Sequence, residues 1–123
     1  MALRTLHYHR QRRLLDLVFT DGAVQVLSAE FLRVHSPSAE VRGHGKPRLI
    51  ANKRDVGIRT IHPVGHYGVK LTFDDGHDTG LYSFRYLCQL AEDQHSLWQQ
   101  YLAKLKAANA SRDSLIDTRQ LSH

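Results

Sequence analysis

The feature that most constrains the fold of this 123-residue chain is a stretch in which apolar and polar side chains alternate. Apolar residues at 67, 69, 71 and 73 alternate with Gly68, Lys70 and Thr72. Successive side chains of a β-strand point to opposite faces, so this pattern predicts a strand with one buried and one solvated face. The turn-forming run Asp74-Asp75-Gly76 follows, and we expect the chain to return as a second strand over 79–83.

A second hairpin and a short helix are predicted before this strand. The apolar run 14–19 leads into Asp21-Gly22, a strong hairpin signal, and residues 23–27 then pair back. Ser28 is a typical N-cap residue, which predicts a helix of about two turns after it. Pro37 ends that helix, because the residue before a proline avoids the helical conformation.

From Phe84 onward the apolar spacing becomes that of a helix, with a stripe formed by Leu87, Leu90, Leu97, Trp98, Tyr101 and Leu105. Polar residues around Asp93 predict a break, with Asp93 capping the second helix. The sum is an α+β fold: a small antiparallel β-sheet body with a short early helix and a C-terminal helical element. We expect one domain over 14–106, between a basic flexible leader at 1–13 and a flexible tail at 107–123.

Basic residues are concentrated in two parts of the chain and give it a net charge of +5. They are Arg4, Arg10, Arg12 and Arg13 near the N-terminus, and Arg42, Lys46, Arg48, Lys53, Arg54 and Arg59 in the middle. Such patches are either solvated surface or binding sites for phosphate backbones and acidic partners. Aromatic residues are not interleaved with them, so the stacking surface of a single-strand nucleic-acid binder is not expected.

Cysteine content and hydropathy exclude several classes of protein. Cys88 is the single cysteine, which rules out an intrachain disulfide and an iron–sulfur cluster held by this chain alone. No apolar run approaches the roughly 20 residues of a membrane-spanning helix, and the N-terminus has no apolar stretch of signal-peptide type. We therefore expect a cytoplasmic protein without a membrane partner.

Unusual residues gather in two runs, 36–44 and 74–80, each of which combines turn formers, carboxylates and a histidine. Neither run contains a hydrolytic triad or a complete phosphate-binding loop. His77 lies in the predicted turn between two strands. It is a candidate metal ligand, a hydrogen-bond anchor of the turn, or an exposed tip.

The chain has nine histidines, so metal binding is weighed for the other pairs as well. His62 and His66 are four residues apart, but Pro63 lies between them and prevents the helix that such a pair of ligands needs. His7 and His9 are two residues apart and chelate only loosely, because nothing anchors them in the predicted leader.

Three segments together carry a family resemblance. They are 32–44, which contains Ser36-Pro37-Ser38-Ala39-Glu40-Val41-Arg42-Gly43-His44; 61–67, which reads Ile61-His62-Pro63-Val64-Gly65-His66-Tyr67; and 73–87, which begins Phe73-Asp74-Asp75-Gly76-His77. In order and spacing they resemble the DUF971 family, the domain similar to the N-terminal domain of gamma-butyrobetaine hydroxylase. The resemblance covers about residues 14–106.

The resemblance implies a domain that is separate from catalysis. In the hydroxylases this domain precedes a separate jelly roll that binds Fe(II) and 2-oxoglutarate and carries the catalytic activity. The resemblance therefore does not imply oxygenase activity for this chain. Related domains are also fused to P-loop ATPases that carry iron–sulfur clusters, which implies a role beside cluster assembly.

The resemblance also implies a lost zinc site. The hydroxylase domain holds a structural zinc through three cysteines and one histidine; the histidine position resembles His77, and the cysteine positions resemble Ser36, Ser38 and Val41. A serine hydroxyl or a valine cannot replace a thiolate on zinc, so no bound metal or other cofactor is expected. Hydrogen bonds among Ser36, Ser38 and His77 are expected to join the loop and the turn instead.

We interpret the chain as a non-catalytic protein-interaction module with a link to iron–sulfur or metal homeostasis. Its expected motif residues are Ser36, Ser38, Arg42, Gly43, His44, Asp75, Gly76 and His77. The alternative is a zinc- or iron-binding protein that uses His77 with His44, His62 or His66. A nucleic-acid binder and an enzyme with a pocket lined by Arg42, His44 and His77 are the remaining hypotheses, and no pattern specifies the partner or an oligomeric state.

Overall fold

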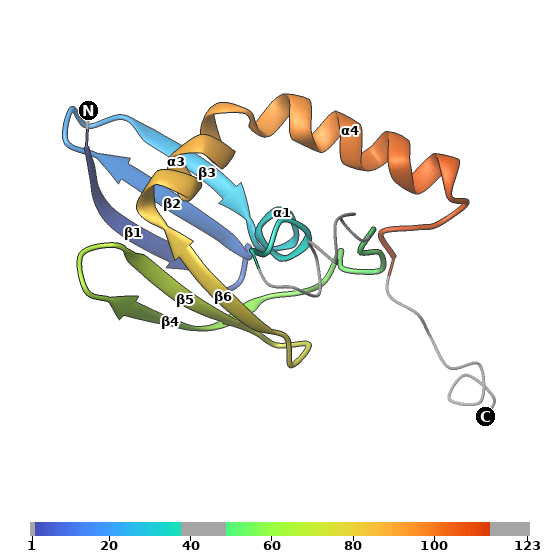
Figure 1. Ribbon diagram of the computed structural model, residues 1–123, viewed down its shortest axis with the longest axis horizontal. Coiled ribbons are helices and arrows are strands. Elements are labelled where there is room, and N and C mark those ends of the chain that lie inside the picture. The colour runs from blue at the N-terminus through green and yellow to red at the C-terminus, as the bar shows by residue number, and fades with distance from the viewer. Residues whose placement is uncertain (1, 38–48, 114–123) are drawn as a thin grey trace.

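The computed structural model describes residues 2–37 and 49–113. Within these ranges the chain forms two antiparallel sheets and three helices (Figure 1). The first sheet has the order β1-β2-β3, with β1 (Leu3–His9), β2 (Leu14–Phe19) and β3 (Val24–Ser28). The second has the order β4-β5-β6, with β4 (Ile58–Val64), β5 (Gly68–Phe73) and β6 (Asp78–Ser83). The helices are α1 (Ala29–Val34), α3 (Phe84–Glu92) and α4 (Gln94–Ala107). This is the predicted α+β fold, with its strands divided between two sheets.

The main hydrophobic core joins the two sheets to α1 and α3. Its most buried members are Leu15, Leu17, Leu27, Phe31, Leu32, Val69, Leu71, Phe73, Tyr82, Leu87 and Leu90. In β5 the side chains at 69, 71 and 73 are buried while Lys70 is exposed, which confirms the predicted alternation. Burial of one face also fixes the register of β5, because a shift by one residue would turn its apolar side chains to solvent.

Tyr67 is an exception to the predicted alternation, since it is 74% exposed. β5 begins one residue later, at Gly68, and Tyr67 lies in the turn that follows β4. Its N–H donates to the carbonyl of Val64, and its own carbonyl accepts the N–H of Phe84. The prediction that Tyr67 faces the core is therefore wrong, because the turn carries this residue past the end of the sheet.

The predicted flexible leader is wrong for Leu3–His9, because these residues form β1 and pair antiparallel with β2. Leu6 and Tyr8 pack against the main core, and the Tyr8 hydroxyl accepts the N–H of Ile58 at 2.9 Å. Basic residues and histidines occupy the solvent-facing positions of β1, so the short alternation of apolar residues in the sequence is easily overlooked.

The predicted flexible tail is wrong for the part that the structure describes. After α4 the chain returns, and segment 111–113 lies along segment 52–54. The N–H of Asn52 donates to the carbonyl of Ser111 at 2.9 Å, and the N–H of Arg54 donates to the carbonyl of Arg112 at 2.8 Å. Side-chain contacts of Arg112 with α1 add to these bonds. The rest of the predicted tail, from 114 onward, lies outside the described residues.

The predicted helix boundaries are confirmed at both ends of α1 and between the later helices. The hydroxyl of Ser28 accepts the N–H of Phe31 at 3.0 Å, and α1 ends before Pro37. Asp93 separates α3 from α4 as expected, although its side chain makes no capping hydrogen bond. In the described ranges, none of the helices combines the length and the apolar character that a membrane span requires.

Candidate functional site

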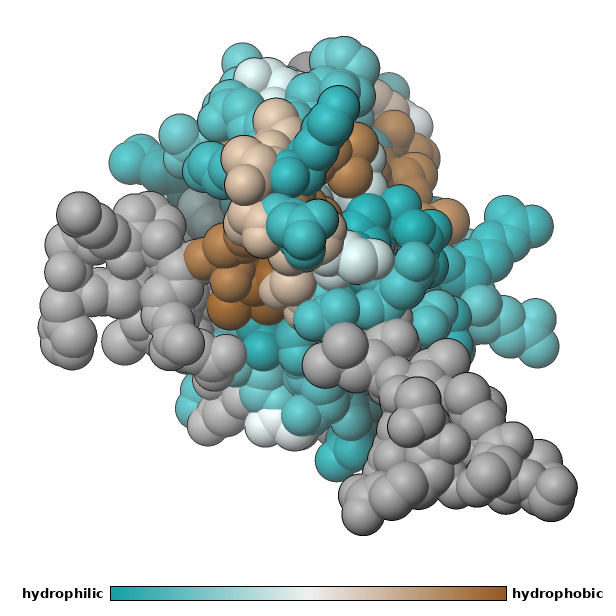
Figure 2. Space-filling view, turned by 90° about the vertical axis from the view of Figure 1, so that its right-hand side faces the viewer, coloured by the Kyte–Doolittle hydropathy of each residue, from teal (hydrophilic) through white to brown (hydrophobic). Residues whose placement is uncertain are grey.

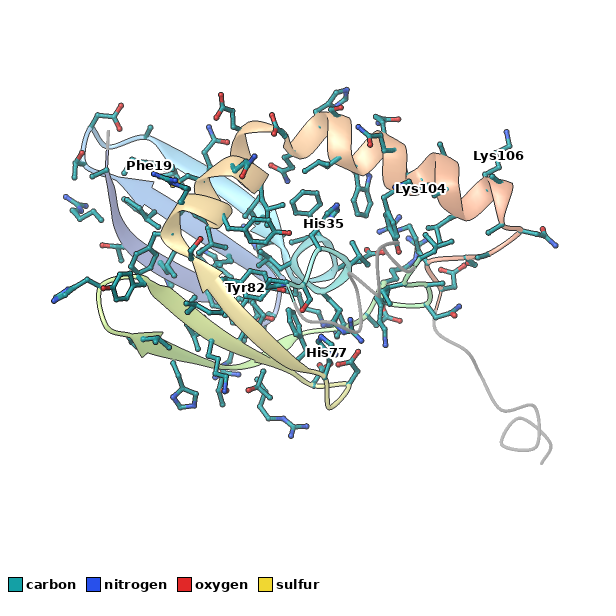
Figure 3. The ribbon with its side chains drawn as sticks, in the orientation of Figure 1. Phe19, His35, His77, Tyr82, Lys104 and Lys106 are labelled. Carbon is teal, nitrogen blue, oxygen red and sulfur yellow. The ribbon has the colours of Figure 1, made fainter. Side chains whose placement is uncertain are left out.

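Five polar residues connect the end of α1 to the turn between β5 and β6, and we call them the His77 cluster: Arg33, Ser36, Lys53, Asp75 and His77. The hydroxyl of Ser36 lies 3.1 Å from Nε2 of His77. Ser36 is 1% exposed and His77 is 8% exposed, so this hydrogen bond is buried. Figure 3 shows His77 at the β5–β6 turn, close to α1. The expected hydrogen bond between the loop and the turn is thus present for this pair.

Asp75 is the electrostatic centre of the His77 cluster. One carboxylate oxygen accepts Nε of Arg33 at 2.9 Å and Nζ of Lys53 at 2.6 Å, and the other accepts the N–H of His77 at 3.0 Å. Burial alone raises the pKa of Asp75, but these hydrogen bonds outweigh burial and lower the pKa to about 2. The carboxylate therefore stays ionised at every physiological pH and holds two cations from distant parts of the chain.

The His77 cluster does not have the geometry of a nucleophilic serine site. Such a site needs an oriented histidine and a hydroxyl that the substrate can reach. Asp75 engages the main-chain N–H of His77 and thereby shapes the turn, and Ser36 is too deeply buried to meet a substrate. The contacts of the cluster instead fasten α1 to the second sheet, together with the Tyr82 hydroxyl, which donates to the carbonyl of Leu32.

The described residues also do not fit a structural zinc. Zinc in such sites is held by four ligands, usually thiolates and imidazoles. Among the residues that the structure describes, the His77 cluster offers one imidazole, whose Nε2 is hydrogen-bonded to the hydroxyl of Ser36. A neutral hydroxyl is a poor replacement for a thiolate, so this arrangement favours a hydrogen-bonded junction over a metal centre.

The other expected motif residues are divided between described and undescribed parts of the chain. Gly76 lies in the turn with a φ of +85°, a left-handed conformation that favours glycine. Ser38, Arg42, Gly43 and His44 lie outside the described residues, so two of the three residues of the pocket that the enzyme hypothesis requires, Arg42 and His44, are outside them as well.

The histidines of the metal-binding alternative are not brought together where the structure describes them. His62 is in β4 and His66 is in the turn after it, and both are exposed. His77 is buried at the opposite end of the second sheet, since the β5–β6 turn and the β4–β5 turn are at the two ends of β5.

A second candidate site is a cavity of about 340 Å³ beside α1 and α4, which we call the arginine cavity. Its lining includes Arg12, Arg13, Glu30, Arg54, Trp98 and Arg112. The four arginines come from three separate segments: the turn after β1, the segment before β4 and the segment after α4. The side of the molecule on which α4 ends is largely hydrophilic (Figure 2).

Arg112 and Glu30 form the fixed part of the arginine cavity. Nε and Nη2 of Arg112 donate to the two carboxylate oxygens of Glu30 at 2.9 and 2.8 Å. The guanidinium carbon lies 4.9 Å from the ring centre of Trp98, a cation–π contact. Hydrogen bonding to Glu30 raises the pKa of Arg112, so this guanidinium is permanently charged. Glu30 is neutralised by this pair and is only 4% exposed.

The remaining arginines give the cavity an excess of positive charge. Nε of Arg54 pairs with Asp113 at 2.6 Å on the surface. Among the described residues, neither Arg12 nor Arg13 forms an ion pair. Two arginine side chains are therefore available to a negatively charged group that enters the cavity.

Three of these arginines belong to the two concentrations of basic residues in the sequence, but the sequence did not predict that they line one cavity. Arg12 and Arg13 belong to the basic group near the N-terminus, and Arg54 belongs to the basic group in the middle of the chain. These two groups were the only sequence signal for the cavity. Arg112 was missed because it falls in the predicted tail. Trp98 was assigned to the core; it does pack against the main core, but it also lines the cavity.

Comparison with known proteins identifies similar chains. The sequence profile described as "Gamma-butyrobetaine hydroxylase-like, N-terminal" matches residues 6–88. A crystal structure at 1.93 Å from Acidithiobacillus ferrooxidans ATCC 23270, of a protein with unknown function that belongs to the DUF971 family, is similar with a TM-score of 0.62. It is 31% identical in sequence, and the match covers 72% of this chain and 91% of that chain.

Two solution structures determined by NMR are similar over 94% of this chain. One is 45% identical, with a TM-score of 0.81 and 93% of its own length covered. The other is 54% identical, with a TM-score of 0.78 and 88% of its own length covered. No curated protein matches the chain significantly.

Proposed function

This chain belongs to the family of gamma-butyrobetaine hydroxylase-like N-terminal domains, the DUF971 family, and we propose that it is a non-catalytic accessory module that binds a protein partner. The matching family model describes the N-terminal part of proteins like gamma-butyrobetaine hydroxylase, and the crystal structure from the family is of a protein with unknown function. The buried, hydrogen-bonded state of Ser36 and His77 supports a structural role for the turn that contains His77.

The arginine cavity is the observation that carries this proposal. It combines a half-buried tryptophan with Arg12 and Arg13, whose charges no described carboxylate neutralises. Arginine and tryptophan are among the residue types most enriched at the energetic centres of protein interfaces. The occupant that fits this chemistry is an acidic segment of a protein, with a carboxylate between the arginines and a side chain against Trp98.

A protein partner fits the cavity better than a nucleic acid does. A nucleic-acid backbone is tracked by an extended stripe of basic residues with several stacking aromatics. Here four arginines, Arg12, Arg13, Arg54 and Arg112, line one cavity of about 340 Å³ that contains a single tryptophan. The geometry suits one or two acidic side chains rather than a row of phosphates.

We propose that the partner is a cytoplasmic protein that takes part in iron–sulfur or metal homeostasis. This part of the proposal rests on the fusion of related domains to P-loop ATPases that carry iron–sulfur clusters. Iron–sulfur scaffold and ATPase proteins of the same organism are therefore the first purified proteins to test.

We also propose that the His77 cluster is the remnant of a zinc site. The buried hydrogen bond between Ser36 and His77 supports this proposal, because it joins the two segments that the zinc would join. The zinc content of purified, untagged protein should be the same for wild type and His77→Ala. Zinc that is lost together with the His77 imidazole would refute the proposal.

Fluorescence of Trp98 provides the test of partner binding, since it is the single tryptophan of the chain and lines the arginine cavity. We would titrate the protein with a short polyglutamate peptide and then with the purified scaffold and ATPase proteins. Saturable fluorescence changes are expected, and Arg12→Ala/Arg13→Ala should weaken them at least about tenfold, the effect of losing charged hydrogen bonds at an interface.

The matched control is Arg4→Ala/Arg85→Ala, which removes the same charge from exposed positions outside the cavity. It should bind like wild type, apart from a small effect of net charge at low salt. Equal weakening in both double variants would mean that only net charge matters. Tighter binding of a single-stranded oligonucleotide than of any protein tested would reject the protein-binding proposal.

A further inference from the structure

Three potential metal ligands lie together on the outer face of the first sheet: His7, His9 and Asp16. His7 and His9 are two residues apart on β1, so their side chains share a face. Asp16 is the cross-strand partner of His7 on β2, which places its carboxylate on the same face. The ligand atoms of all three residues lie within 4.8 Å of one another.

The contacts within this group are already close. Nε2 of His9 lies 2.8 Å from a carboxylate oxygen of Asp16, and the rings of His7 and His9 have centres 4.4 Å apart. Ligands on one zinc ion, each about 2.0–2.2 Å from the metal, are separated by no more than about 4.4 Å. A small rotation of the side chains therefore brings all three atoms to coordination distance.

The strand pairing supplies the anchor that the sequence did not reveal. β1 is held by β2 along its whole length, and Leu6 and Tyr8 on its inner face pack against the core. This fixes the backbone of His7 and His9, so little conformational entropy is lost when both rings bind one ion. A His-x-His pair on a mobile leader would lack this advantage.

The ligand set identifies the class of metal. Two imidazoles and one carboxylate suit zinc and its neighbours among the transition metals, whereas calcium and magnesium prefer oxygen ligands alone. Three protein ligands leave a coordination position open to water or to a donor from another molecule. His7 is exposed and the other two residues are half-buried, so the ion would exchange with solvent.

We propose that His7, His9 and Asp16 form a zinc-binding site on the outer face of the first sheet. This site is distinct from the His77 cluster and from the arginine cavity, and it shares no residue with either. It also differs from the histidines His44, His62, His66 and His77 that the sequence favours as ligands.

The proposal is tested with untagged, full-length protein that has been stripped of metal with a chelator. Calorimetric titration with Zn²⁺ alone should show one equivalent bound per chain, and Co²⁺ should give a visible absorption spectrum typical of nitrogen and oxygen ligands. In NMR spectra, the ring nitrogen signals of His7 and His9 should shift with Zn²⁺, and those of the other histidines should not.

Variants assign the ligands. His7→Ala and Asp16→Ala should each weaken zinc binding at least about tenfold, the effect seen even for residues that only support a metal ligand. The matched control is His62→Ala/His66→Ala, which removes exposed histidines on β4 and in the turn after it and should bind zinc like wild type. Thermal melts without metal should be similar for all these proteins, because none of the replaced side chains is in the core.

Three results would overturn the proposal. They are the absence of zinc binding by wild type, unchanged binding by both His7→Ala and Asp16→Ala, and ring nitrogen shifts confined to other histidines. The NMR result on wild type decides the matter even where a variant folds poorly. It is also independent of the arginine cavity, so partner binding and zinc binding can fail separately.

Discussion

At the scale of single residues, the charge of Asp75 makes the stability of the folded chain depend on pH. Its hydrogen bonds to Lys53, to the N–H of His77 and to Arg33 outweigh the effect of burial and lower the pKa from 3.8 to about 2. Because the folded-state pKa lies below the unfolded one, the carboxylate stabilises the folded state fully above about pH 4. This contribution is lost as the pH falls toward about 2.

We expect Asp75→Asn to lower the free energy of unfolding near neutral pH and to have a progressively smaller effect below about pH 4. Denaturant titrations of both proteins over a series of pH values measure this difference. Burial also lowers the pKa of His35, so both proteins lose stability below about 6.5, the ordinary pKa of histidine. Subtracting one curve from the other removes that shared effect. A difference that stays constant down to about pH 2 would contradict the assignment to Asp75.

Residue-level predictions succeeded where the reason was local. Ser28 caps α1 and Gly76 adopts the left-handed turn conformation because N-cap and turn chemistry are decided by neighbours in the chain. His77 was named correctly as a turn residue, but its three possible roles could not be separated. The reason is that Ser36 and Arg33, which complete the cluster, are about forty positions away in the sequence.

At the scale of elements, Gly68 determines how closely β5 and β6 approach each other. A Cβ atom added to Gly68 would lie 2.1 Å from the carbonyl oxygen of Tyr82 and 2.7 Å from Cα of Ser83. These are main-chain atoms, so no side-chain rotation can relieve the clash. We expect Gly68→Ala to lower the free energy of unfolding by about 3 kcal/mol or more, as a strong case of overpacking.

Denaturant unfolding measures this effect, and Gly80→Ala is its matched control. Gly80 lies in β6, where an added Cβ would have its nearest neighbour 3.7 Å away in Pro37, an ordinary contact distance. This control should therefore change stability by less than about 1 kcal/mol, as a substitution without steric conflict does. A loss for Gly68→Ala as small as that for Gly80→Ala would contradict this steric argument and mean that β5 and β6 can move apart at little cost.

Element predictions failed where polar residues hid a pattern. The alternation in β5 is long and its apolar residues are large, so the strand was recognised from the sequence. In β1 the core-facing residues Leu6 and Tyr8 are separated by histidine, and the segment resembles a basic leader. The mistake had a consequence for function, because it removed the anchor from His7 and His9 and with it the argument for a metal site.

At the scale of the whole molecule, the His77 cluster and the arginine cavity are formed by parts of the chain that meet only after folding. The arginine cavity is lined by residues from the turn after β1, from the segment before β4 and from the segment after α4. Local patterns report charge concentrations but not which of them converge. Pairing between segments 52–54 and 111–113 is what brings Arg54 and Arg112 to the same cavity, and no periodicity in the sequence indicates it.

A hydrogen bond of Tyr8 joins the two sheets, and its removal tests how much this bond contributes to holding the sheets together. Its hydroxyl accepts the N–H of Ile58, the first residue of β4, and so links the first sheet to the second. Tyr8→Phe keeps the ring in place but leaves this N–H without its acceptor, which should cost about 1–3 kcal/mol. Denaturant unfolding measures the loss, and amide exchange at Ile58 should accelerate more than exchange elsewhere in β4. Tyr67→Phe is the control, because Tyr67 is 74% exposed and should be neutral. If Tyr8→Phe were equally neutral, this hydrogen bond would contribute nothing measurable to stability, and β1 would be held by its pairing with β2 and by the packing of Leu6 and residue 8 against the core.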